Sequence, residues 1–140
     1  MMELRIPVEA EAAALAATRR SPAQEVVVFE AIDALDEAIA GGQDTAKLDL
    51  AFHMAIARAT NNPRFELCLE ALGIGAIPRV GVSSHDHGGR SSSYDKQLNS
   101  EHREIANAIA AGDGAVPRSW MRKHMESGLQ RYRDLRASTE

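Results

Sequence analysis

Apolar residues recur at helical spacing along most of this chain, and turn-forming residues interrupt the pattern. Val26, Phe29 and Ile32, for example, form one stripe that follows Ser21 and ends near Gly41. Serine followed by proline is typical of a helix start, and glycine is typical of a helix end. Aromatic residues make up only 4% of the chain, which disfavours a sandwich or barrel of strands. The sequence therefore predicts an all-α fold.

The interruptions divide the chain into about six helices. A length of 140 residues, of which 44% are hydrophobic, fits one domain over residues 1–140 with its own core. Pro117 is expected in or just before the first turn of the last helix. The predicted helices, with approximate limits, are residues 4–20, 22–40, 45–60, 63–72, 98–111 and 117–129.

The stretch from Val82 to Tyr94 shows neither helical nor strand periodicity. It is rich in serine and glycine, and we expect a flexible loop there. His85 and His87 lie in this stretch and could bind a metal loosely, but such surroundings favour solvated side chains. We therefore leave both outside the predicted site.

Charge and targeting signals narrow the class of protein. The formal net charge is -4, and no clustered lysines and arginines predict a nucleic-acid surface. Cys68 is the only cysteine, so no disulfide can form within the chain and a reducing compartment is compatible. The sequence has neither an apolar segment of signal-peptide type at its start nor a membrane-spanning stretch. We expect a cytoplasmic protein without a membrane partner.

Four polar residues interrupt the apolar stripes. Asp49 and His53 are four residues apart, which places both side chains on one face of a helix. His102 and His124 lie on two later helices, each among apolar residues that should face inward. One such histidine is most often a buried, hydrogen-bonded core residue, but four polar residues from three helices are harder to explain in that way.

Burying three imidazoles and a carboxylate costs free energy unless each group has a partner. A divalent cation would satisfy all four groups and hold the imidazoles neutral. Three nitrogens and one oxygen suit zinc, nickel, iron or cobalt better than magnesium or calcium. Such an ion can keep a coordination position for water or for an incoming carboxylate, so the predicted site could either catalyse a reaction or sense a ligand.

The motifs together resemble the FCD domain, the FadR-type C-terminal effector domain of GntR-superfamily transcriptional regulators. The resemblance covers nearly the whole chain in order. The histidine spacings, 102 − 53 = 49 and 124 − 102 = 22, are similar to those of metal-containing members. The segments that carry it are residues 5–9, 12–17, 49–53, 60–63, 101–105, 108–109, 112–113 and 121–124.

The resemblance implies an antiparallel helical bundle that encloses a metal and a small carboxylate effector. By matching positions, the implied metal ligands are Asp49, His53, His102 and His124. Zinc is the metal we expect first, with nickel as the alternative. Members of this family usually dimerise, so we expect a homodimer.

Two further residues are candidates for contact with the effector. Arg5 matches an arginine on the first helix of the family and could bind the carboxylate. A salt bridge from Arg5 to Glu9, four residues on, is the alternative. Asn99 lies three residues before His102, so its side chain could reach the ligand or a ligating histidine.

Three functions remain open on these residues. The first is a metal-dependent sensor domain without enzyme activity, which binds DNA only through a winged-helix domain that we expect to be absent from this chain. The second is a metal-dependent hydrolase-like enzyme, which needs a general base such as Glu101 or Glu9. The third is a metal-free helical interaction module, in which the polar cluster only completes a core network.

Overall fold

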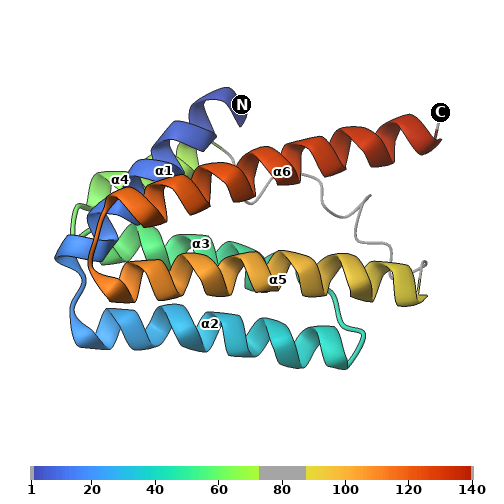
Figure 1. The fold of residues 1–140 in the computed structure, drawn as a ribbon, viewed down its shortest axis with the longest axis horizontal. Coiled ribbons are helices and arrows are strands. Elements are labelled where there is room, and N and C mark those ends of the chain that lie inside the picture. Colours follow the sequence, from blue (N-terminus) through green and yellow to red (C-terminus); the bar gives the residue numbers. More distant parts are fainter. Residues whose placement is uncertain (1, 73–87, 140) are drawn as a thin grey trace.

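The structure is a computed structural model that describes residues 2–72 and 88–139. The described part contains six helices and no strand, which confirms the predicted all-α fold (Figure 1). The helices are α1 Met2–Arg19, α2 Pro22–Ala40, α3 Ala46–Ala59, α4 Pro63–Ala71, α5 Gly88–Ala111 and α6 Ala115–Thr139.

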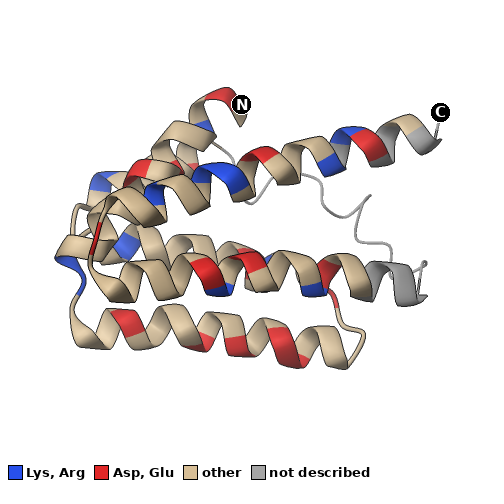
Figure 2. Cartoon of the chain, in the orientation of Figure 1, with Lys and Arg blue, Asp and Glu red and all other residues tan. Residues whose placement is uncertain are grey.

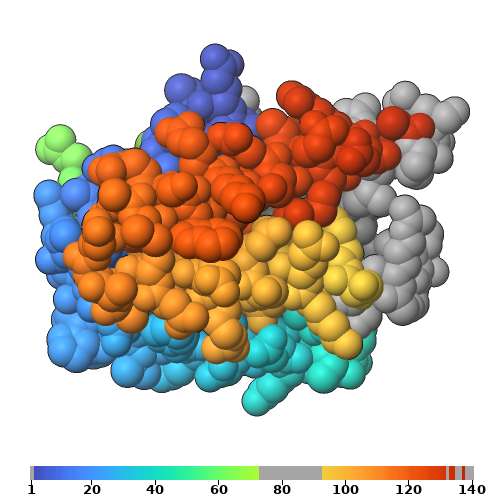
Figure 3. All heavy atoms as spheres, in the orientation of Figure 1, coloured from blue at the N-terminus to red at the C-terminus, as the bar shows by residue number. Residues whose placement is uncertain are grey.

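The helices form a bundle in which α1, α2, α3, α5 and α6 surround the core and α4 packs on the outside of α1 and α3. Helix α1 packs against α6, α3 and α5, while α2 packs against α3 and α5. Helices α5 and α6 run in opposite directions, and so do α2 and α3 (Figure 1). Side chains of α5 and α6 meet over one face of the molecule and cover the interior there (Figure 3).

Local signals in the sequence explain several helix limits. Ser21 and Gln24 form a capping box, because Ser21 Oγ accepts a hydrogen bond from Gln24 N and Gln24 Oε1 accepts one from Ser21 N. Gly112 follows the end of α5 with φ +84, a left-handed conformation that glycine adopts readily. Pro117 lies in the first turn of α6, as predicted.

Alanines on α1 let this helix approach its neighbours closely. Ala13 and Ala16 are fully buried, and six alanines of α1 belong to the buried set. A Cβ atom added to Gly114 would lie only 3.2 Å from the carbonyl oxygen of Ala14, so the turn before α6 also lies close to α1. Larger apolar side chains fill the rest of the core: Val28, Ile32, Leu35, Phe52, Ile56, Ile105, Ile109, Met121 and Met125.

The predicted loop from Val82 to Tyr94 was wrong over its second half. Helix α5 begins at Gly88 and continues through the serines that follow. Extending a helix costs far less than starting one, so the strongly periodic segment around Leu98 can carry the helix back through residues of low propensity. The first half of the predicted loop, together with His85 and His87, lies outside the described residues.

Every charged residue of α2 is acidic, and these residues mark one side of the bundle (Figure 2). They are Glu25, Glu30, Asp33, Asp36 and Glu37. Among the helices of the described part, none combines the length and the apolar character needed to cross a membrane.

Replacing Ala16 with leucine tests the close packing of α1. The added atoms have no free space, so we expect a loss of about 1–3 kcal/mol in the free energy of unfolding. The matched control is Ala51→Leu, at an exposed alanine in the middle of α3, where we expect a change within about 0.5 kcal/mol. Urea denaturation monitored by circular dichroism measures both. Equal stability of the two variants would contradict the close approach of α1.

Candidate metal centre

Three buried histidines converge between α3, α5 and α6. His53, His102 and His124 come from these three helices in turn, and each is at most 4% exposed. One ring nitrogen of each lies within 4.8 Å of the others. Because a Zn–N bond is about 2.0–2.1 Å, the ligand nitrogens of a tetrahedral site lie roughly 3.4 Å apart, and small ring movements would close the cluster around an ion.

Asp49 completes the cluster from one turn before His53. Its Oδ1 atom lies 3.2 Å from His102 Nε2 and 3.7 Å from His53 Nε2. The structure therefore brings together all four residues that the sequence predicted as metal ligands. Two of them lie on α3, and α5 and α6 supply one each.

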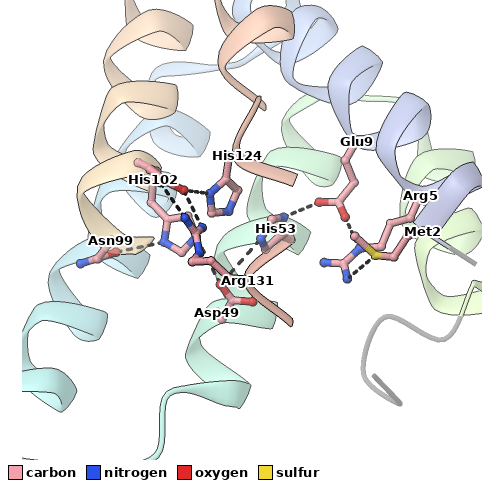
Figure 4. A network of polar contacts seen from close by, with 10 residues as sticks. Met2, Arg5, Glu9, Asp49, His53, Asn99, His102, His124 and Arg131 are labelled. Carbon is pink, nitrogen blue, oxygen red and sulfur yellow. Dashed lines mark hydrogen bonds and ion pairs between the residues drawn. The ribbon is translucent and has the colours of Figure 1, made fainter. Parts of the chain in front are cut away.

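The Nδ1 atom of each histidine contacts an oxygen of another side chain (Figure 4). His53 Nδ1 is hydrogen-bonded to Glu9 Oε1. His102 Nδ1 lies 3.0 Å from Asn99 Oδ1, and His124 Nδ1 lies 2.7 Å from Glu101 Oε1.

The opposite nitrogens provide a test of whether an ion fits. His53 Nε2 and His102 Nε2 are buried and lie 3.7 and 3.2 Å from Asp49 Oδ1, but neither makes a well-aligned hydrogen bond within the described part of the chain. A buried nitrogen of this kind costs free energy unless it finds a partner. Both nitrogens lie beside the Asp49 carboxylate, so a cation between them would satisfy nitrogen and oxygen together. The residues present fit a metal with imidazole and carboxylate ligands.

Electrostatics differ strongly between the histidines. Burial lowers the pKa of His53, but Glu9 and Asp49 outweigh burial and raise the pKa to about 9. Burial lowers the pKa of His102 to about 4, and burial likewise lowers the pKa of His124. Two imidazoles are therefore neutral near pH 7, whereas a metal would have to displace a proton from His53.

The two glutamates of the cluster are held ionised. Burial raises the pKa of Glu9, but His53 and Arg5 outweigh it and bring the pKa below its ordinary value. Burial also raises the pKa of Glu101, yet hydrogen bonds from His124 and Arg131 lower it to about 2. Arg131 reaches Glu101 from α6, with Nη2 3.0 Å from Oε1.

Arg5 forms an ion pair with another residue of α1. Its side chain is buried, and its Nε donates a hydrogen bond to Glu9 Oε2. The salt bridge that the sequence offered as the alternative is therefore present. Contact between Arg5 and an effector stays a prediction.

A small cavity lies beside the cluster. Its volume is about 10 Å³, close to what one water molecule requires. Five of its eight lining residues are polar, and the other three are apolar residues of α2 and α5. Because the space is so small, binding an organic acid here requires the walls to move apart. The lining residues are Leu35, Ile39, Thr45, Asp49, Asp95, Leu98, Asn99 and His102.

Sequence reasoning missed the contacts of Glu9 and Glu101 with the histidines. Glu9 was considered as a salt-bridge partner and a general base, and Glu101 as a general base. A signal for Glu9 did exist, because Arg5, Glu9 and Ala13 recur every four residues on one helical stripe. Glu101 could not be paired with His124 before the crossing of α5 and α6 was known.

The sequence is similar to one protein family and to a curated regulator. The profile of the FCD domain matches residues 1–127. Among curated proteins, the HTH-type transcriptional regulator LutR of Bacillus subtilis (strain 168) is 27% identical over 125 residues. The alignment covers 89% of this chain and 57% of the relative, so the chain spans little more than half of that relative's length.

Removing one histidine tests the cluster directly. We expect His124→Ala and His102→Ala to lose bound zinc, because each removes a ligand from a site of four. Elemental analysis after zinc loading and gel filtration measures the stoichiometry. Chelation should lower the melting temperature of the wild-type protein, by the equivalent of about 2.7 kcal/mol at a zinc concentration 100 times the dissociation constant, and should leave the variants unchanged.

His87→Ala is the control for this experiment, because the sequence places His87 outside the site. It should bind zinc as the wild-type protein does. Full zinc stoichiometry in both His102→Ala and His124→Ala would overturn the ligand assignment.

Proposed function

The chain belongs to the FCD domain family, and we propose that it is the metal-dependent, effector-binding domain of a transcriptional regulator of the GntR superfamily. The convergence of three buried histidines and Asp49 carries this proposal. The similarity to LutR, which is described as an HTH-type transcriptional regulator, supports a regulatory role.

Asp49, His53, His102 and His124 would hold a divalent transition metal. We propose zinc, with nickel as the alternative, because both accept imidazole nitrogen and carboxylate oxygen. With these four ligands in place, the ion would take the carboxylate of a small organic acid as a further ligand by expanding its coordination beyond four. The cavity beside His102 is the space nearest to the ligands, and the effector would enter it only after its walls move apart.

We propose that this domain does not contact DNA itself. DNA would be bound by a winged-helix domain rather than by this one, and the acidic surface of α2 supports that division, because it would repel phosphates (Figure 2). We also propose that the domain forms a homodimer and acts in the cytoplasm.

The contacts of the two glutamates favour binding over hydrolysis. An enzyme would need a general base near the metal, and the candidates were Glu101 and Glu9. Glu101 holds His124 and Arg131, and its pKa is lowered to about 2, so it would accept a proton poorly. Glu9 is buried between His53 and Arg5.

A metal-free interaction module is less well supported by the same geometry. Such a module would pair its buried polar atoms with one another. His53 Nε2 and His102 Nε2 instead share one oxygen of Asp49, at 3.7 and 3.2 Å, without a well-aligned hydrogen bond within the described residues.

Calorimetric titration of small carboxylates tests the sensor proposal. We expect saturable binding to the zinc-loaded protein, with no conversion of the carboxylate, because the ion provides the anion site. The metal-free wild-type protein and zinc-treated His102→Ala serve as controls and should bind at least tenfold more weakly. Equal binding to metal-free and zinc-loaded protein would contradict a metal-dependent sensor.

A further inference from the structure

We propose that Glu9, Asn99 and Glu101 are positioning residues that turn the Nε2 atoms of all three histidines toward one point. Each accepts the Nδ1 hydrogen of one histidine (Figure 4). This inference rests on the proposed metal site, and it deepens that proposal by naming the groups that set metal affinity.

The amide of Asn99 fixes the tautomer of His102. Asn99 Nδ2 lies 3.1 Å from the carbonyl oxygen of Ile32 and 2.6 Å from Asp36 Oδ1, and both of these atoms can only accept hydrogen bonds. The amide nitrogen therefore faces α2, and the amide oxygen faces His102. His102 must donate from Nδ1, which leaves the lone pair on Nε2 for a metal.

The two glutamates act on His53 and His124 in the same way. A carboxylate only accepts hydrogen bonds when ionised, so each histidine donates from Nδ1. A carboxylate partner also makes the imidazole a stronger metal ligand than a neutral amide does. We therefore expect Glu9 and Glu101 to contribute more to metal affinity than Asn99.

Each of the three acceptors is itself bonded to an arginine, either directly or through one other side chain. Arg5 holds Glu9 within α1, and Arg131 of α6 holds Glu101 of α5. Asn99 is bonded to Asp36, whose other oxygen lies 2.9 Å from Arg103 Nη2. The acceptors are therefore restrained from rotating, and each histidine is oriented by a chain of contacts rather than by one hydrogen bond.

Glu101→Gln and Glu9→Gln test the proposal on the intact chain. A glutamine keeps the size of the side chain but removes its negative charge, so it is a weaker acceptor for the Nδ1 hydrogen and leaves the imidazole a weaker metal ligand. We expect the dissociation constant for zinc, measured by competition with a chromophoric chelator, to rise about 10–100-fold in each variant. Glu101 is partly exposed, so its variant should fold even if Glu9→Gln does not.

Matched controls are available on the same helices. Glu11→Gln and Glu104→Gln make the same change at surface glutamates of α1 and α5, and neither should alter the zinc dissociation constant by more than about twofold. Long-range ¹H–¹⁵N spectra of labelled histidines give a second measurement, which general destabilisation would not produce. The zinc-loaded wild-type protein should show three imidazoles protonated at Nδ1, and Glu101→Gln should shift His124 alone.

The outcomes separate the inference from the function on which it rests. Unchanged zinc affinity in both glutamine variants, or zinc bound through Nδ1, overturns the positioning role and leaves the metal site intact. A wild-type protein that binds zinc but no carboxylate overturns only the sensor proposal. A wild-type protein that binds no zinc overturns both.

Discussion

The cost of burying polar groups in a helical core is the constraint on which this structure depends. Three imidazoles and two carboxylates, those of Asp49 and Glu9, lie almost fully out of solvent between the helices. Such groups are tolerated only where each finds a partner. The Nδ1 atom of each histidine contacts another side chain, and the Nε2 atoms of His53 and His102 lie beside Asp49. The bundle thus encloses a polar centre beside its apolar core.

Helix α1 contributes both to the close packing of the bundle and to the polar cluster. Its alanine face allows the helix to lie close against α3 and α6, and the same face carries Arg5 and Glu9 inward. With larger residues in place of the alanines, Glu9 would stand too far from His53 to accept its hydrogen bond. Small side chains on this helix therefore support the site as well as the fold.

Local patterns predicted much of this arrangement. The breaks at Ser21, Gly41 and Pro63 predicted where the helices of the first half of the chain begin and end, because capping and φ preferences act within a few residues. The four predicted ligands could be grouped because helical spacing places inward-facing residues reliably. Pairings such as Glu101 with His124 depend on how two helices cross, which no local pattern encodes. The start of α5 was misjudged because helix extension outweighed the low propensity of glycine and serine.

Three arginines neutralise the acidic side chains around the histidines, and this affects which ions the interior attracts. Arg5, Arg103 and Arg131 offset the charges of Glu9, Asp36 and Glu101 in turn. With a divalent ion at the proposed site, Asp49 sets one negative charge against two positive ones. The centre would then carry one surplus positive charge inside a protein whose formal net charge is -4. An acidic domain can in this way draw in an anion that its surface would repel.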